Sequence, residues 1–168
     1  MRLNRALIGG AALLALATLT GCGEDDPMSE AGLPSASDMA SLTKLIDEHG
    51  GCRNLEANPA DWDYMSEETE DPAWGIKERA YCVDAEGDDV TLLLIDDMKK
   101  FQEQSAKDGA EFQVGKNFAV AAVNENTGHA LAEGKLLFMS CDPDFTTPSG
   151  YKKLPALVDK CVLSDYLG

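Results

Sequence analysis

The chain of 168 residues is predicted to be an α+β protein, with a single sheet of four or five mainly antiparallel strands, helices packed mainly on one face, and two disulfides. Three observations favour this class. Segments with apolar residues at helical spacing alternate with short β-rich runs such as 90–95 (VTLLLI). A glycine-containing turn at 85–88 joins two adjacent strands and makes that pair antiparallel. Four cysteines beyond position 22 form an even set.

Residues 1–21 have the three-part layout of an export signal. Arg2 and Arg5 supply positive charge, and residues 6–20 form an uncharged, mostly apolar run. A helix needs about 20 apolar residues to cross a bilayer core, so this run is too short to favour a permanent membrane span.

The tetrapeptide Leu19-Thr20-Gly21-Cys22 closes this leader and resembles the lipobox of bacterial lipoproteins. The resemblance implies that residues 1–21 are removed and that the sulfur of Cys22 carries a diacylglyceryl group. Two or more acyl chains, at about 0.8 kcal/mol per buried methylene, give stable attachment. It therefore implies localisation at the cell membrane, lipid-anchored on the extracytoplasmic face. The alternative is an ordinary secretory signal cleaved near a cysteine that later enters a disulfide.

Three regions follow from this interpretation. They are a lipoprotein signal peptide (1–21), a lipidated cysteine with a flexible linker (22–37), and a single α+β domain (38–168). The linker is polar, contains Pro27 and Pro34, and is expected to hold the domain on the order of 20 Å from the lipid headgroups.

The charge of the mature chain is strongly negative. Removal of Arg2 and Arg5 with the leader leaves 12 basic against 30 acidic residues, a formal charge of −18. Nucleic acid is therefore a poor partner, because binding it requires basic side chains that neutralise phosphates. An anionic lipid surface would also repel the domain, so we expect the tether to hold it at the membrane. Solubility explains the acidity, and attraction of cations or of a basic partner is the alternative.

The cysteines of the folded part are Cys52, Cys82, Cys141 and Cys161, and an exported chain meets an oxidising compartment. Three pairings of four cysteines exist. We predict Cys52 with Cys82, since the strand holding Cys82 pairs with a segment that begins at Cys52. We predict Cys141 with Cys161, since Cys161 lies on the apolar stripe of a closing helix that must pack near Cys141.

The expected elements follow in chain order. Helices are predicted over 38–49, 96–109, 126–134 and 154–162 from helical spacing of apolar residues and from capping residues. Strands are predicted over 52–55, 79–84, 90–95, 118–123 and 135–141 from β-rich composition and alternation.

The segment 56–77 fits neither periodicity and is the expected recognition surface. Between Glu56 and Lys77 it contains Trp62, Tyr64 and Trp74 among six acidic residues: Asp61, Asp63, Glu67, Glu68, Glu70 and Asp71. Long irregular loops in compact domains are often functional, so these three aromatic residues are the predicted binding residues. The alternative is that both tryptophans cover one side of the core while the acids remain solvated.

Catalytic motifs are mostly missing. Ser149-Gly150-Tyr151-Lys152 matches S-x-x-K, but so does Ser41-Leu42-Thr43-Lys44, and no K-T-G follows. The chain also lacks G-x-S-x-G, H-E-x-x-H and C-x-x-C. His129 is the single candidate for a general base, with a surface or capping histidine as the alternative.

No metal or cofactor is predicted apart from the covalent lipid on Cys22. Calcium is an alternative for two acidic segments, 84–89 and 67–71, because both concentrate hard oxygen ligands. The first departs from the EF-hand loop, with glycine at its fourth position instead of its sixth.

In layout the chain resembles small uncharacterised lipoproteins of high-GC Gram-positive bacteria, which implies an outward-facing membrane protein and no particular reaction. We therefore expect a non-catalytic binding or interaction module of the cell envelope, whose partner is an envelope protein or a small ligand. The alternatives are a small envelope hydrolase using His129 and a structural or immunity-type surface protein.

Overall fold

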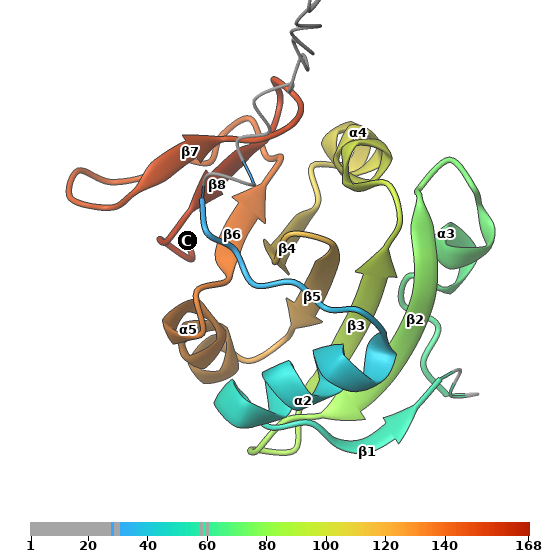
Figure 1. Cartoon of the computed structure of the whole chain (residues 1–168). Coiled ribbons are helices and arrows are strands. Elements are labelled where there is room, and N and C mark those ends of the chain that lie inside the picture. The colour runs from blue at the N-terminus through green and yellow to red at the C-terminus, as the bar shows by residue number, and fades with distance from the viewer. Residues whose placement is uncertain (1–27, 29–30, 58, 60) are drawn as a thin grey trace, which may run out of the picture.

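The computed structural model describes residues 28, 31–57, 59 and 61–168. The expected signal peptide (1–21), Cys22 and most of the expected linker lie outside these residues. The described part contains one antiparallel sheet of eight strands in the order β1-β2-β3-β5-β4-β6-β8-β7 (Figure 1). The strands are β1 (Arg53–Glu56), β2 (Ile76–Val83), β3 (Asp89–Ile95), β4 (Glu111–Val114), β5 (Phe118–Ala122), β6 (Leu137–Ser140), β7 (Lys153–Pro155) and β8 (Val162–Ser164).

The helices are α2 (Met39–His49), α3 (Ser66–Glu70), α4 (Met98–Asp108) and α5 (Glu125–Glu133). Side-chain oxygens cap three of them. Asp38 accepts from the amide of Ser41, Asp97 from that of Lys100, and Asn124 from that of Asn126. Gly109 ends α4 in the left-handed conformation, as its sequence position predicts.

The α+β class, the antiparallel sheet and the two disulfides are confirmed, but the prediction of four or five strands is wrong. The additional strands are short, with four residues in β4 and three each in β7 and β8. The predicted closing helix over 154–162 is a β-hairpin instead, because Leu154 pairs with Leu163 and β8 pairs with β6. The leucines and valines of this segment are spaced as in an amphipathic helix, but they lie in two short strands and the turn that connects them.

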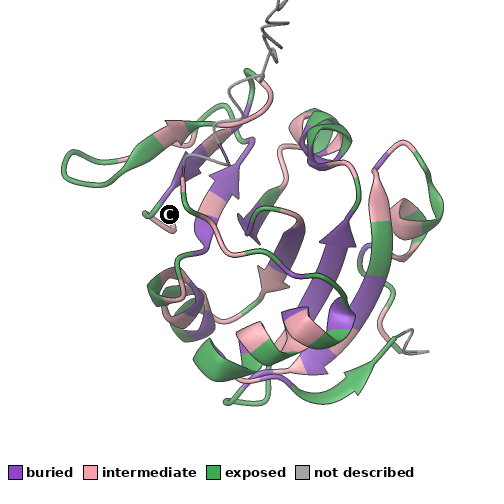
Figure 2. Cartoon of the chain, viewed as in Figure 1, coloured by how far each residue is buried: buried purple, intermediate pink, exposed green. Residues whose placement is uncertain are grey.

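Helices cover both faces of the sheet, which corrects the prediction that they pack mainly on one. Along β3, Leu93 and Ile95 belong to the core that contains Met98 and Phe101 of α4. Val90, Leu92 and Leu94 point to the opposite face, where the core includes residues of α2 and α5. A central strand buried on both faces becomes almost wholly apolar, which explains the run VTLLLI. Figure 2 shows β3 buried along most of its length.

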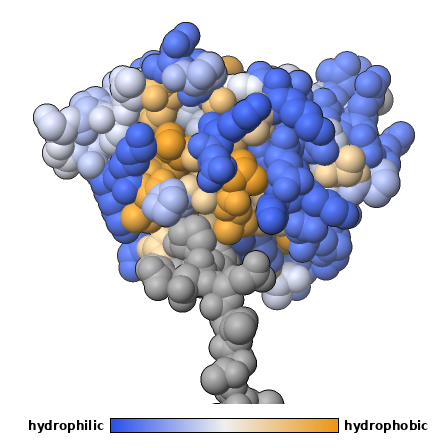
Figure 3. Space-filling model, turned by 90° about the horizontal axis from the view of Figure 1, so that it is seen from above, coloured by the Kyte–Doolittle hydropathy of each residue, from blue (hydrophilic) through white to orange (hydrophobic). Residues whose placement is uncertain are grey.

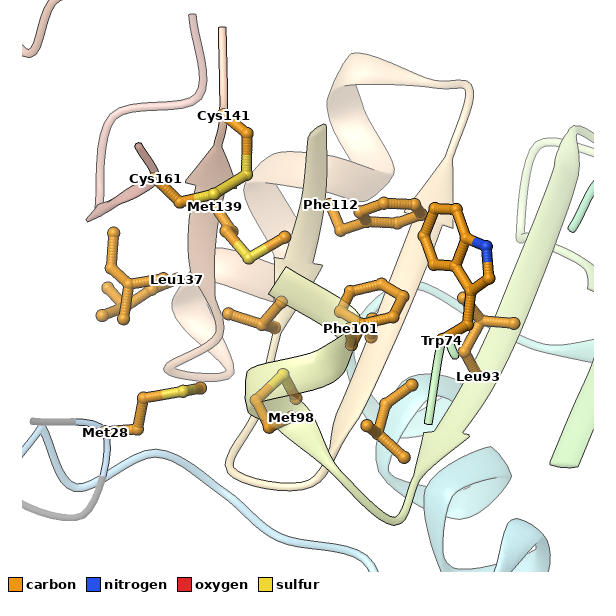
Figure 4. Packing of buried hydrophobic residues seen from close by; sticks show 14 of the residues in the cluster. Met28, Trp74, Leu93, Met98, Phe101, Phe112, Leu137, Met139, Cys141 and Cys161 are labelled. Atoms are coloured by element: carbon orange, nitrogen blue, oxygen red, sulfur yellow. A yellow bond between two sulfur atoms is a disulfide. The ribbon is translucent and has the colours of Figure 1, made fainter. Parts of the chain in front are cut away.

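Both predicted disulfide pairings are confirmed. Cys52–Cys82 joins the residue before β1 to β2 across 30 residues, and Cys141–Cys161 joins the residue after β6 to the residue before β8 across 20 residues. The second bridge lies in the same core as Phe101, Phe112 and Met139 (Figure 4).

The described part of the expected linker packs against the domain. Met28 is only 1% exposed, and its sulfur accepts a hydrogen bond of 3.2 Å from Nε2 of Gln102. The amide and carbonyl of Ala36 form two hydrogen bonds with the side chain of Asn117, at 3.0 and 2.6 Å. Gly115 permits this approach, since a Cβ there would overlap the ring of Phe118 and lie 2.7 Å from the carbonyl oxygen of Pro34.

Candidate functional site

A pocket forms where two neighbouring strands of the sheet separate. β5 pairs with β3 as far as Ala122, and β4 pairs with β6 from Glu111 onward. Between β4 and β5, however, only Gln113 with Val120 and Val114 with Ala119 are paired. The start of β4 and the end of β5 therefore diverge and leave an opening beside them.

This opening has a volume of about 460 Å³. That size suits a small organic molecule. Its walls combine apolar and aromatic side chains with a few polar groups. The lining residues are Trp62, Tyr64, Thr91, Glu111, Phe112, Gln113, Val120, Ala121, Ala122, Val123, Asn124, Glu125, Gly128, His129, Phe138, Leu167 and Gly168.

One wall comes from the 61–65 loop, which Arg79 holds in place. The guanidinium of Arg79 donates to the carbonyl oxygens of Trp62 and Tyr64, at 3.2 and 2.9 Å. Arg79 is 4% exposed, and among the described residues it forms no ion pair. The indole Nε1 of Trp62 in turn donates to Oγ1 of Thr91 on β3, at 2.8 Å. These bonds fix the indole against the sheet.

Aromatic neighbours extend this wall. The ring of Trp62 lies 6.3 Å from that of Tyr64 and 5.7 Å from that of Tyr81. Burial, together with the nearby carboxylate of Glu68, raises the pKa of Tyr64. A hydrogen bond to Asp89 raises the pKa of Tyr81 to about 12. Both phenols therefore remain neutral at physiological pH.

Another wall comes from α5, which is tied to the turn between β2 and β3. The buried carboxylate of Asp84 accepts hydrogen bonds from the amides of Glu86, Gly87 and Asp88 at 2.8–2.9 Å, and from the hydroxyl of Thr127. Burial alone would raise the pKa of Asp84, but these four donors outweigh it and lower that pKa. The first turn of α5 is thereby held at the pocket.

A second contact positions the middle of α5. Gln113 is buried on β4, and its Nε2 donates to the carbonyl oxygen of Gly128 at 2.6 Å. His129 follows and is solvent-exposed at the pocket, where Glu111 and Glu125 also lie. Among the described residues, no hydrogen bond or ion pair involves the imidazole of His129. It therefore lacks the partner that would orient it for proton transfer.

The structure brings together three of the four residues that the sequence singles out for binding or catalysis. Trp62 and Tyr64 line the pocket on one side and His129 on another. Trp74 lies elsewhere, 8% exposed in the core, with its ring 5.9 Å from that of Phe101 (Figure 4). Sequence reasoning missed Gln113, Phe138 and Leu167. Gln113 could have been noticed in the sequence, because it is a polar residue between Phe112 and Val114 in a β-rich run.

The acidic turn 84–89, one of the two segments considered for calcium, has other partners. The side-chain amides of Asn124 and Asn126 donate to the carboxylates of Glu86 and Asp88 at 2.6–2.9 Å. No group of three or more His, Cys, Asp or Glu side chains in the described ranges is arranged to hold a metal ion.

Comparisons with family models, with curated proteins and with solved structures found nothing that matches this chain. Within the part of the chain that the structure describes, no helix combines the length and the hydropathy needed to cross a bilayer.

Proposed function

We propose that the protein is a lipid-anchored extracytoplasmic lipoprotein whose domain is a non-catalytic module binding a small molecule between the separated ends of β4 and β5. The observation that carries the binding role is the pocket itself, of about 460 Å³, with Trp62, Tyr64 and Phe138 in its walls. The anchor is supported by the lipobox-like tetrapeptide ending at Cys22.

The lining residues indicate the class of ligand. Aromatic and aliphatic walls favour a molecule with an apolar body. The charged side chains at the pocket include Glu111 and Glu125, and none of the described lining residues is Lys or Arg. A neutral or cationic ligand is therefore favoured over an anionic one, since an anion would face two carboxylates without a lysine or arginine to compensate them.

The chemistry of the pocket favours binding over catalysis. Among the described lining residues, the aliphatic hydroxyl group belongs to Thr91. This side chain is fully buried, and its oxygen already accepts a hydrogen bond from the indole of Trp62. A nucleophile needs an exposed oxygen or sulfur within reach of a base, and among the described lining residues Thr91 does not meet that condition.

The neutral dye N-phenyl-1-naphthylamine tests this function. We expect its fluorescence to rise on binding and the emission of Trp62 to change, because that indole lines the pocket. Trp62→Ala combined with Tyr64→Ala should weaken dye affinity by about tenfold, since an aromatic contact contributes about 0.5–1.5 kcal/mol. Tyr151→Ala is the matched control, because Tyr151 is 51% exposed and lies outside the pocket. Equal loss in both variants would reject the assignment.

A small envelope hydrolase is the second candidate, favoured by the presence of His129, Glu111 and Glu125 among the residues that line the same pocket. In this version His129 would activate a water molecule. Wild-type protein and His129→Ala would be compared against a panel of ester and peptidoglycan substrates. Activity that survives in His129→Ala would reject it.

A further inference from the structure

Two segments of the domain carry basic residues out of proportion to their length. They are α4 (98–108) and the segment 152–160, which includes β7. Of the 12 basic residues beyond the leader, six lie in these segments, together with only three of the 30 acidic residues. All six are solvent-exposed lysines: Lys99, Lys100, Lys107, Lys152, Lys153 and Lys160. The acids among them are Glu103, Asp108 and Asp159.

Lysines and apolar side chains form one surface here. Val158 lies in a shallow depression with Lys107, Lys160, Glu103 and Asp159, and it also borders a second depression that contains Lys153. Half-buried apolar residues at the edge of the core continue this surface: Ala106, Leu154, Ala156, Leu157 and Val158. Figure 3 shows hydrophobic residues exposed at this end of the molecule, bordered by hydrophilic ones.

The N-terminal segment enters the domain beside this same surface. Gln102 of α4 links the two, since its Nε2 donates to the sulfur of Met28 at 3.2 Å and its Oε1 accepts from the amide of Leu157 at 2.7 Å. Cys22 precedes Met28 by six residues. A fully extended chain of that length spans about 20 Å. A lipid on Cys22 therefore cannot move farther than this from the entry point.

We propose that this surface, formed by 98–108 and 152–160, faces and contacts an anionic lipid bilayer. The inference rests on the lipid anchor proposed above. Lysine ammonium groups pair with headgroup phosphates, and the side chains of Leu157 and Val158 lie at headgroup level. The rest of the domain surface is more acidic than this one, so an anionic bilayer would repel it more strongly. This difference in repulsion favours the orientation proposed here. The surface shares no residue with the β4–β5 pocket, which stays open to solvent.

Lysine acetylation on vesicles tests the orientation. Mature lipidated protein, purified from the producing bacterium, is reconstituted on vesicles of phosphatidylcholine alone or mixed with phosphatidylglycerol. Flotation first measures attachment, so a protein that fails to float overturns the anchor rather than the orientation. A water-soluble acetylating reagent is then applied, and mass spectrometry measures the rate at each lysine. Lys44 and Lys135, outside the proposed surface, are internal references.

We expect Lys107, Lys153 and Lys160 to react severalfold more slowly than the references on phosphatidylglycerol vesicles, since each lysine near an anionic surface shifts the docked population about fivefold. High salt should remove this protection. Protection that is equal on both vesicle types would instead indicate that the lysines pair with the chain's own acidic residues 24–26, and unprotected lysines on floating protein would also overturn the proposal.

Charge-reversal variants provide a second test of the proposed orientation. In Lys107→Glu combined with Lys160→Glu, protection of Lys153 should be lost. The matched variant, Lys44→Glu combined with Lys77→Glu, leaves Lys135 as the reference and should retain the protection. Retained protection in the first variant would show that these lysines do not orient the domain.

Discussion

The Nη1 atom of Arg79 lies 2.9 Å from the carbonyl oxygen of Tyr64, so that a buried cation on β2 holds a loop that carries two pocket residues. The same nitrogen also donates to the carbonyl of Trp62. The position of the aromatic wall therefore depends on one side chain that does not itself line the pocket.

Replacing Arg79 by methionine should weaken dye binding about tenfold, by analogy with the loss of two aromatic contacts. The change in unfolding free energy should stay within about 1 kcal/mol. Two hydrogen bonds from a charged donor are lost, each worth about 1.5–3 kcal/mol, while removal of a buried unpaired charge offsets this loss. Urea unfolding and dye titration measure the two effects separately.

Arg53 offers the matched control for this variant. Its guanidinium also donates to two carbonyl oxygens, those of Asp84 and Ala85, at 2.7 and 2.8 Å, but it lies outside the pocket. Arg53→Met should leave dye affinity unchanged. An equal loss of affinity in both variants would contradict a specific role of Arg79 in placing the loop.

Acid should destabilise the protein partly through Asp84. Burial raises its pKa, but the hydroxyl of Thr127 and three amides outweigh burial, so the folded pKa is lowered. The resulting stabilisation is present above the unfolded pKa of about 4 and is lost as the pH falls through the lower folded value. Asp84→Asn should therefore be less stable at pH 7 yet lose less stability between pH 7 and pH 3.

Urea unfolding at the two pH values measures this difference. Asp88→Asn is the control, because Asp88 is exposed and belongs to the same turn. If Asp84→Asn and the wild type lost the same free energy on acidification, the carboxylate of Asp84 would not be a source of the acid sensitivity.

Local patterns were sufficient to predict the central elements. The cap at Asp38, the apolar run of β3 and the glycine after α4 are features of neighbouring residues, and the structure has them at those positions. The disulfide pairing followed from placing Cys52 beside the strand that holds Cys82.

The rest depended on contacts between residues far apart in the chain. β7 and β8 have three residues each and exist because Leu163 lies between Leu154 and Met139 of neighbouring strands. The pocket arises from the divergence of β4 and β5, and no local pattern reports where two paired strands separate. For this reason Trp62 and His129 could be named from the sequence, but their common pocket could not.

Each disulfide should contribute about 3 kcal/mol to stability, because the crosslinks close loops of similar size, 30 and 20 residues. Cys52→Ser with Cys82→Ser, and Cys141→Ser with Cys161→Ser, should lower the unfolding free energy by similar amounts in urea. A loss below about 1 kcal/mol in either pair would show that the unfolded chain is already compact across that loop.

Gly128→Ala should stabilise the protein, although the residue lines the pocket. Gly128 lies within α5, where glycine costs about 0.5–1 kcal/mol relative to alanine. A Cβ at this position would lie 3.6 Å from Cδ1 of Leu167 and 3.9 Å from Oε1 of Gln113, which are ordinary contact distances. We therefore expect a gain of about 0.5–1 kcal/mol in urea unfolding.

The same helix supplies the contrast at Gly134, where a Cβ would lie 2.6 Å from the ring of His49. Gly134→Ala should lower stability, because the imidazole of His49 would have to leave its present position to relieve this overlap. The two variants add the same methyl group near α5, so their opposite signs separate helix propensity from packing. Loss of stability in Gly128→Ala would contradict this expectation and would indicate that the added methyl group clashes with Leu167, the side chain nearest to it at 3.6 Å.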